Sequence, residues 1–459
     1  MAVDQAPAPR GSFFGDVNVV MLTYLADGVL AFATGAVIAR ALGADGRGAY
    51  ALFVLSAAFA QLVLGMGIGN AGIYYLNRRE IALRDVLGAV HAVVAFAAVV
   101  SAITVSAIVP WAGEIFGDGI SPWLFVAAVP LLLYLALLRL VLQALQRFVA
   151  LGVTVVGQQV LVLALVTGIW VAGDVTREGV IVALIAASAA AAAFALVRVG
   201  LAEVDVMRAL RPAALQRLVT FGVQGEVGNA LQALNYRLDQ FLVRAFVSLA
   251  GVGIYATSAS LTESLFVMAN AVALVLMPRL SADEDEAAWM TPIACRNTLA
   301  LAAAGSVALA IAAPVVVPLV FGHAFDDSVQ ALWLLLPGTV ALTGSKVLAS
   351  YIFSRGRPLV NTAITAVSVV VTLVADVVLI PAFGVNGAAV ASSLAYLVHF
   401  GAALVAYRRI SGAPALDAVL ARPSDARLYA EAARGLIARL APAGRRGDPA
   451  VAGSPRGGV

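Results

Sequence analysis

The chain has 459 residues, of which 62% are hydrophobic and only 12% are charged, and its formal net charge is +3. Soluble domains usually contain about 25% charged residues, so this composition excludes an ordinary soluble protein and indicates an integral membrane protein. The single cysteine, Cys295, excludes an intramolecular disulfide and any multi-cysteine metal site, and we interpret it as a small core or loop residue.

A membrane-spanning helix needs about 20 predominantly apolar residues. The sequence offers twelve such segments, at 18–39, 49–75, 86–111, 122–146, 151–172, 180–199, 219–246, 253–277, 297–320, 329–353, 360–381 and 385–407. The first segment is as long as a full span, so we interpret it as an uncleaved helix rather than as a signal peptide. The expected fold class is therefore an all-α integral membrane protein with about twelve transmembrane helices.

Arginine is concentrated in alternate loops between these segments. The richer loops contain Arg78, Arg79, Arg84, Arg147, Arg208, Arg211, Arg279, Arg296, Arg355 and Arg357, whereas the loops between them contain only Arg40, Arg47, Arg177 and Arg244. Cytoplasmic loops of membrane proteins carry the excess of lysine and arginine. We therefore expect a multi-pass protein of the cytoplasmic membrane with both termini in the cytoplasm.

Several short motifs recur in the two halves of the chain at a nearly constant offset. Arg40 and Tyr50 flank a glycine-rich turn, and Arg244 and Tyr255 flank a similar one. The further matches are Phe116-Gly117 with Phe321-Gly322, Pro130 with Pro337, and Arg139 with Lys346, and all offsets lie between 204 and 207 residues. We expect two six-helix bundles related by a pseudo-two-fold axis along the membrane normal, with the substrate site between them.

These features divide the chain into five parts. They are a cytoplasmic N-terminus (1–17), an N-terminal bundle (18–200), an amphipathic cytoplasmic linker (201–217), a C-terminal bundle (218–408) and a cytoplasmic tail (409–459). The tail begins with a second amphipathic segment, 425–440, and ends in a Pro-, Gly- and Arg-rich stretch that is typical of disorder. We interpret both amphipathic helices as surface packing or contact with anionic lipid rather than as specific partner sites.

The spans contain charged side chains that are costly in lipid. An ionisable group in the hydrocarbon core costs about 2.5–3.5 kcal/mol on insertion scales, so such groups usually form pairs or line a polar lumen. The candidate substrate contacts of a cationic lumen are Arg237, Lys346, Arg139, Gln240 and Asn229. Asn229, Arg237 and Gln240 share one helical face, because Arg237 follows Asn229 by about two turns and Gln240 follows Arg237 by about one turn.

The acidic residues of the spans are candidate counter-ions or ion-coupling groups, namely Asp27, Glu226, Asp239, Glu263 and Asp376. Each buried charge also has a structural interpretation. Arg237 could be salt-bridged across helices, Arg139 lies near enough to a span end to snorkel, and for any single acid a structural hydrogen bond is favoured. Arg40 and Arg244 are expected to be anchors at the outer interface.

Patterns typical of enzymes are scarce. The three histidines are scattered, no HExxH or Cys/His cluster occurs, and Gly344-Ser345-Lys346 has the wrong order for a phosphate-binding loop. We therefore predict no catalytic residues, no metal site and no cofactor, and we do not expect the chain to be an enzyme. The glycine-rich segments 65–72 and 222–228 are candidate hinges.

Two stretches carry a family resemblance. They are TGAVIARALGADGRGAYALFVLSAAFAQLVLGMGIGNAGIYYLNRR in the first two spans and LNYRLDQFLVRAFVSLAGVGIYATSASLTESLF in the seventh and eighth. They resemble the polysaccharide-export flippases of the Wzx type, whose superfamily also holds lipid II flippases and multidrug antiporters. The resemblance implies a V-shaped pair of bundles that alternate access. It also implies an undecaprenyl-pyrophosphate-linked oligosaccharide as cargo, moved from the inner to the outer leaflet.

The first functional hypothesis is thus a flippase for an anionic lipid-linked saccharide in cell-surface polysaccharide biosynthesis. An ion-coupled multidrug or cation antiporter of the same superfamily is the alternative, although its lumen should contain more acids and fewer cations. A saccharide polymerase or ligase is disfavoured because the outer loops are short. The expected partners are the saccharide, membrane lipids and, further, a glycan polymerase and glycosyltransferases; no nucleic acid is expected, and the chain should be a monomer.

Overall fold

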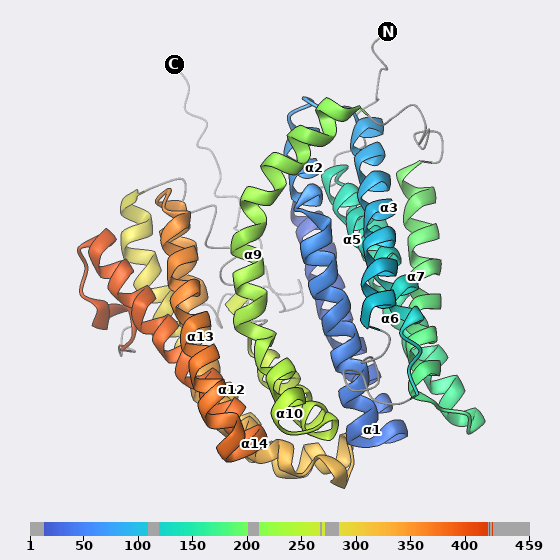
Figure 1. The fold of residues 1–459 in the computed structure, drawn as a ribbon. Coiled ribbons are helices and arrows are strands. Elements are labelled where there is room, and N and C mark those ends of the chain that lie inside the picture. The colour runs from blue at the N-terminus through green and yellow to red at the C-terminus, as the bar shows by residue number, and fades with distance from the viewer. Residues whose placement is uncertain are drawn as a thin grey trace, which may run out of the picture.

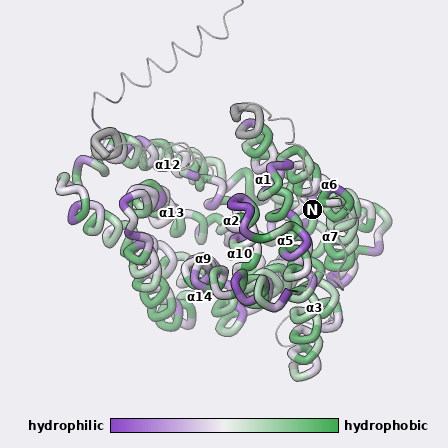
Figure 2. Tube along the Cα trace, turned by 90° about the horizontal axis from the view of Figure 1, so that it is seen from above, coloured by the Kyte–Doolittle hydropathy of each residue, from purple (hydrophilic) through white to green (hydrophobic). Residues whose placement is uncertain are grey.

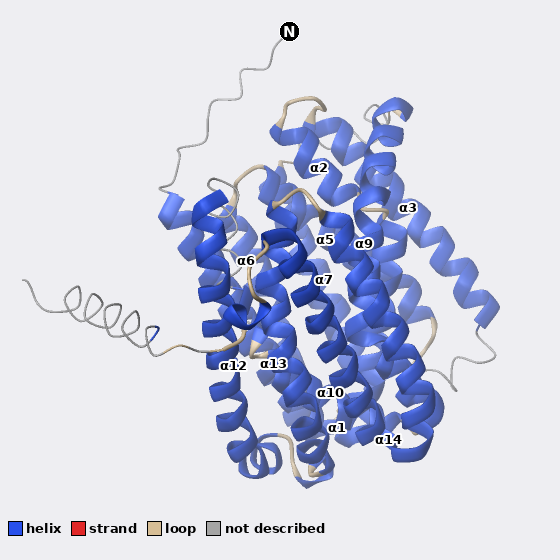
Figure 3. Ribbon diagram, turned by 90° about the vertical axis from the view of Figure 1, so that its left-hand side faces the viewer, coloured by secondary structure: helices blue, strands red, loops and turns tan. Residues whose placement is uncertain are grey.

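The structure is a computed structural model that describes residues 13–108, 119–200, 211–266, 269–270, 284–420, 422 and 425. Within these residues all regular secondary structure is helical (Figures 1 and 3), which confirms the predicted fold class. Most of the predicted linker, the amphipathic tail segment and the predicted disordered end lie outside the described residues.

The first half of the chain forms a group of long helices. They are α1 (Phe13–Gly65), α2 (Ile68–Asn77), α3 (Leu83–Ile108), α5 (Trp123–Ala144), α6 (Phe148–Ala172) and α7 (Arg177–Val199). In Figure 1 they run roughly antiparallel on one side of the molecule. A buried apolar cluster holds α2, α3, α5 and α7 together, including Ile68, Val90, Leu138 and Ala195.

The second half forms a similar group on the other side (Figure 1). Its elements are α9 (Pro212–Phe246), α10 (Leu249–Glu263), α12 (Glu284–Val320), the short 3₁₀ helix η3 (His323–Phe325), α13 (Asp327–Ser354), α14 (Pro358–Ser411) and η4 (Ala415–Ala418). Cys295 is buried in a cluster with Tyr351 and Tyr407, which agrees with its interpretation as a core residue.

Eight described helices are long and apolar enough to cross a membrane. Two of them are continuous through a kink, α1 at Gly43 (φ 68°) and α14 at Gly384 (φ 61°), so each contains two of the predicted spans. The remaining two spans correspond to the more polar α9 and to α10, which has 15 residues. The arrangement therefore agrees with about twelve membrane helices in two bundles.

Two predicted boundaries are corrected by the structure. The second span does not run unbroken to Tyr75, because Met66 (φ 47°) and Gly67 (φ 65°) separate α1 from α2. The helix that contains the seventh span begins at Pro212 rather than at Val219, so the last residues of the expected surface linker are continuous with α9. Proline suits this first turn because its missing N–H would have no helical partner there.

Many large hydrophobic side chains are exposed on the described helices, and Figure 2 shows hydrophilic residues gathered near α2 at the end of the molecule that faces the viewer. At the opposite end the two halves contact each other through α1 and α10. A Cβ at Gly48 would lie 2.0 Å from the Leu249 carbonyl oxygen, so only glycine permits this contact. Arg40 of α1 donates from Nε to the Val320 carbonyl at 2.9 Å, at the end of α12, where a cation is favourable.

At the end near α2, by contrast, α9 bridges the halves. Leu218 of α9 is part of the apolar cluster of the first half. Arg217 forms a 2.8 Å ion pair with Glu80, and the rings of Phe221 and Tyr74 stack with centroids 4.6 Å apart. The long helix α9 therefore packs against both halves, α14 in its own half and α2 and α3 in the other.

Candidate functional site

A cation pair surrounds one acid in the second half. Arg237 of α9 donates from Nη2 to the Glu263 carboxylate of α10 at 2.9 Å, and both side chains are about one-third exposed. Lys346 of α13 lies within electrostatic range of the same carboxylate. Its ammonium group donates to Asn270 at 3.0 Å and lies 4.6 Å from the centre of the Phe266 ring. The structure thus brings together two of the predicted substrate contacts, Arg237 and Lys346.

A third cation joins them from the first half. Arg47 lies in α1 just after the Gly43 kink, and its guanidinium group is within electrostatic range of Arg237. From the sequence alone, Arg47 is expected in an outer loop, because RALGADGRGAY has the pattern of a glycine-rich turn. The chain in fact resumes its helix directly after Gly43, so Arg47 belongs to the second span. The sequence feature that could have indicated this place is the pair of glycines beside Arg47, Gly46 and Gly48. Gly48 lies at the contact between α1 and α10.

We call Arg47, Arg237, Glu263 and Lys346 the central cation cluster. It combines three cations with one acid, and the other acid within range of Arg237 is Asp239. The cluster therefore carries an excess of positive charge. In a low-dielectric setting such an excess favours a bound anion, and guanidinium groups supply fixed, forked donors for phosphate or carboxylate.

A buried acidic site lies next to the cluster, between α9, α10 and α14. Asp239 accepts hydrogen bonds from the Tyr255 hydroxyl, from the Ser392 hydroxyl at 2.9 Å and from the Gln240 backbone N–H at 2.8 Å. Asp376 is fully buried within electrostatic range of Asp239, and neither of its carboxylate oxygens has a hydrogen-bond partner among the described residues. Two such acids make this the strongest candidate for ion coupling in the described chain.

Arg139 occupies a different place from the other two predicted cations. Its Nη2 atom donates to the Gln158 side-chain oxygen at 2.5 Å and to the Thr154 carbonyl at 3.2 Å, both on α6. Gln158 in turn donates to the Ser188 hydroxyl at 2.7 Å, and Asp27 lies within electrostatic range of Arg139. These contacts stay within the first half, and they engage the guanidinium group in a structural network.

The remaining predicted site residues lie along α9. Asn229 is exposed and donates to Glu226 at 3.3 Å, so these two residues pair with each other. Gln240 is 3% exposed, which keeps it from an open lumen in this conformation. The predicted polar face of α9 is therefore solvent-accessible near Glu226 and Asn229 and buried near Gln240.

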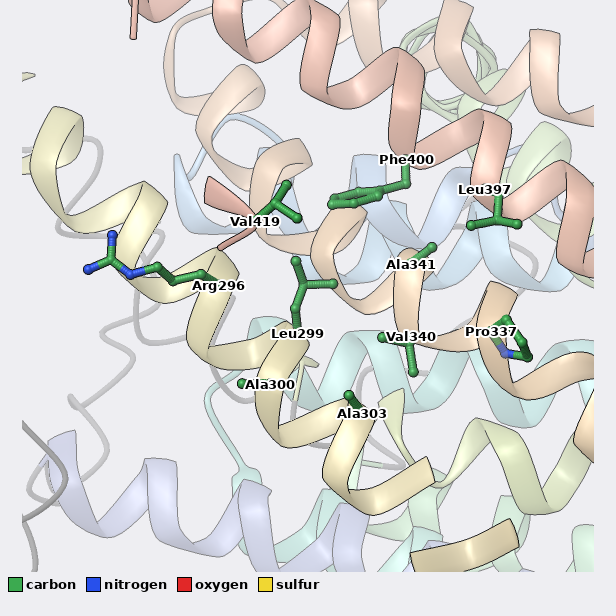
Figure 4. A pocket seen from close by; sticks show the side chains of 10 residues that line it. All are labelled: Arg296, Leu299, Ala300, Ala303, Pro337, Val340, Ala341, Leu397, Phe400 and Val419. Atoms are coloured by element: carbon green, nitrogen blue, oxygen red, sulfur yellow. The ribbon is translucent and has the colours of Figure 1, made fainter. Parts of the chain in front are cut away.

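A separate pocket of about 370 Å³ lies between α12, α13 and α14. Its walls are apolar, with Leu299, Val340, Leu397 and Phe400 among the lining residues (Figure 4). The guanidinium group of Arg296 points away from them in Figure 4 and forms a bidentate pair with Asp425, at 2.6 and 2.5 Å. An apolar pocket with a neutralised cation does not suit an anionic headgroup.

Comparison with known proteins agrees with this architecture. A family model described as "Lipid II flippase MurJ" matches residues 86–422, well over half of the chain. The "Probable low-salt glycan biosynthesis flippase Agl15" of Haloferax volcanii is 23% identical over 167 residues, and the match covers 35% of this chain and 35% of that protein.

Solved structures show the same fold. The lipid II flippase MurJ in an inward closed conformation matches with a TM-score of 0.69 at 12% identity, covering 85% of this chain and 87% of that chain. An inward-facing multidrug resistance MATE family transporter of the MOP superfamily matches with a TM-score of 0.63 at 14% identity, covering 84% and 94%. The match of the family model confirms the expected superfamily, and the expected absence of enzyme activity fits a family of transporters. On the match of its own sequence, this multi-pass membrane protein belongs to the MurJ family of lipid-linked saccharide flippases.

Proposed function

We propose that the chain moves an anionic, undecaprenyl-pyrophosphate-type oligosaccharide from the inner to the outer leaflet for cell-surface polysaccharide biosynthesis. The observation that carries this proposal is the central cation cluster, in which Arg237 and Lys346 flank Glu263. The excess positive charge suits a pyrophosphate group better than a neutral or cationic cargo. The Wzx-type preference for polysaccharide precursors is part of this proposal.

The orientation follows from the distribution of arginines. The loops with Arg78 and Arg79 (between α2 and α3) and with Arg355 and Arg357 (between α13 and α14) join helices at the same end of the molecule in Figure 1. Positive loops stay in the cytoplasm. We therefore place that end, and both termini, on the cytoplasmic side. The contact of Gly48 with α10 then closes the outer side, which supports a state that loads cargo from the inner leaflet.

Transport by alternating access requires a source of free energy. Carrying a negative charge outward is favoured by an inside-negative potential by about 2.3 kcal/mol per charge per 100 mV. A coupling ion or proton would add to this, and Asp239 and Asp376 are the residues that we propose to bind it. Their burial supports this role, because an unpaired carboxylate is costly in a protein interior unless a proton or cation joins it.

The experiment is an export assay in a host that depends on this flippase. Arg237→Ala and Lys346→Ala, singly and together, should reduce surface glycan while the protein level stays normal. Arg408→Ala is the matched control, because Arg408 is an exposed arginine at the end of α14. Full export from a well-expressed double variant would rule the proposal out.

An ion-coupled antiporter for organic cations is the second candidate, and the buried Asp239–Asp376 site favours it. Efflux of a fluorescent organic cation distinguishes the two. The flippase proposal expects no efflux from vesicles above the background of empty vesicles, whereas an antiporter would show efflux that is lost in Asp376→Asn.

A further inference from the structure

Four polar side chains form a row along one face of the first segment of α14, which precedes the kink at Gly384. They follow one another by three or four residues, so they project from the same side of the helix. Each is at most 5% exposed, and they are Thr365, Ser368, Thr372 and Asp376. A buried row of this kind is costly in a membrane span unless each polar group finds a partner.

Two further polar residues join this row from neighbouring segments. The Thr372 hydroxyl donates to the Asn235 side-chain oxygen of α9 at 3.5 Å. The Thr365 hydroxyl lies 3.5 Å from Nε2 of His399, on the second segment of α14. Asn235 is 1% exposed and His399 is 7% exposed, so protein encloses the row. We call these six residues the polar row, namely Asn235, Thr365, Ser368, Thr372, Asp376 and His399.

Structural hydrogen bonds explain only part of this row. The hydroxyl groups of Thr365, Ser368 and Thr372 donate to backbone carbonyls at 3.1, 3.0 and 3.0 Å, as serine and threonine commonly do in helices. Other atoms are buried without a partner in the part of the chain that the structure describes, and they are both carboxylate oxygens of Asp376, Nδ2 of Asn235 and Nδ1 of His399. Buried polar atoms are nearly always hydrogen-bonded, so unpartnered atoms at three places along one row indicate that it takes up a polar or charged ligand.

The polar row extends from the acidic site toward the arginine-rich end of the molecule. Thr365 lies about two turns after Pro358, where α14 begins. Toward the opposite end, the next buried residue of α14 after Asp376 is the apolar Ile380. The contact of Gly48 with α10 also closes that side. The polar row therefore links Asp376 to the end that we place in the cytoplasm.

We propose that the polar row is the path along which a small monovalent cation, or a proton, moves between the Asp239–Asp376 site and the cytoplasm. The inference rests on the proposed function and adds to it the route of the coupling cation and the side on which it exchanges in this conformation. Hydroxyl and amide oxygens replace part of the water around a small cation, as oxygen ligands do in channels. The imidazole of His399 accepts or donates a proton with the same ring. Asn235 and His399 are positioning residues of this path.

Cysteine accessibility of the full-length chain in membrane vesicles tests this path. The variants Thr365→Cys, Ser368→Cys and Thr372→Cys, each combined with Cys295→Ala, are treated with trimethylammonium-ethyl methanethiosulfonate, a cationic reagent that does not cross membranes. From the cytoplasmic side the reagent should label all three positions. Thr257→Cys is the control and should stay unlabelled, because Thr257 is fully buried one turn after Gly253, at the contact with α1. The three positions are independent, so one variant that fails to fold leaves the other two.

Variants of His399 test its positioning role. His399→Leu should slow the labelling of Ser368→Cys and Thr372→Cys by about tenfold, as expected for the loss of one polar contact of a charged group. His399→Gln keeps a polar group and should restore the rate. At constant pH, sodium in place of choline distinguishes the two cations. Slower labelling of Thr372→Cys, one turn from Asp376, identifies sodium, and an equal rate identifies a proton.

Two results would overturn this inference. Row cysteines that are as unreactive as Thr257→Cys from both sides would show that no path exists, and labelling from the outer side alone would show the opposite direction. Either result leaves the cationic lumen of the proposed function intact. Failure of the proposed function is seen separately, as full export from the Arg237→Ala, Lys346→Ala double variant, and it does not depend on the labelling.

Discussion

Gly67 and Gly222 contact each other backbone to backbone. A Cβ at Gly67 would lie 2.3 Å from the Gly222 carbonyl oxygen, and one at Gly222 would lie 2.4 Å from the Met66 carbonyl oxygen. The two segments that the sequence indicates as hinges, 65–72 and 222–228, are thus packed against one another. A movement of α9 relative to the first half would change this contact. The contact therefore links α9 to the break between α1 and α2.

Replacing Gly222 by alanine should therefore destabilise the protein. The added methyl group meets backbone atoms that cannot rotate away, and overpacking of this kind typically costs about 1–3 kcal/mol. Thermal unfolding of the purified protein in detergent measures the effect. Gly225→Ala is the control, because Gly225 lies on the same helix with no atom within 4 Å of its Cβ position. Equal melting temperatures for the two variants would contradict the close contact.

A second prediction tests whether the role of Arg139 is structural or lies in substrate binding. Arg139→Met should lower the melting temperature, because Gln158 loses a charged donor, a loss of about 1–3 kcal/mol for a buried group. Export per molecule of protein should stay near the wild-type value. Comparing surface glycan with protein level checks this. Reduced export at an unchanged melting temperature would instead place Arg139 at the substrate.

The sequence predicted the helices well because apolar length alone defines a membrane span. It also indicated Arg237 and Lys346 as side chains of a cationic lumen, with a salt bridge across helices as the structural alternative for Arg237, because a charge in lipid is expensive wherever it lies. It could not tell that they would share Glu263, since that requires the packing of α9, α10 and α13. The place of Arg47 was predicted wrongly for a local reason. The glycines around it are typical of a turn, whereas within α1 the backbone departs from helical geometry at Gly43.

A third prediction concerns pH and the tail. The hydrogen bonds from Arg296 hold the pKa of the Asp425 carboxyl below its usual range. A depressed pKa in the folded state adds stability above the unfolded value, about 3.9, and this stability is lost as the pH falls through the folded pKa. Asp425→Asn should therefore lower the melting temperature at pH 7, and the difference from the wild type should narrow at about pH 3.

Melting curves of both proteins over that pH range provide the measurement. Asp417→Asn is a suitable control, because Asp417 forms a more exposed pair with Arg422. Exposed pairs contribute about 0–1 kcal/mol, so this variant should change little at either pH. A difference for Asp425→Asn that stayed constant from pH 7 to pH 3 would mean that the Arg296–Asp425 pair does not contribute through its charge.

The last prediction concerns the buried acid of α14. Asp376→Asn replaces a carboxylate that has no described partner by a neutral amide, so it should leave the melting temperature unchanged or raise it. Export should fall nonetheless, because the coupling ion or proton would lose its ligand. Asp174→Asn, at an exposed position before α7, is the control and should change neither the melting temperature nor export. Since ordinary core damage lowers stability and export together, a stable variant that cannot export indicates a functional acid. Normal export from Asp376→Asn would show that transport does not depend on this charge.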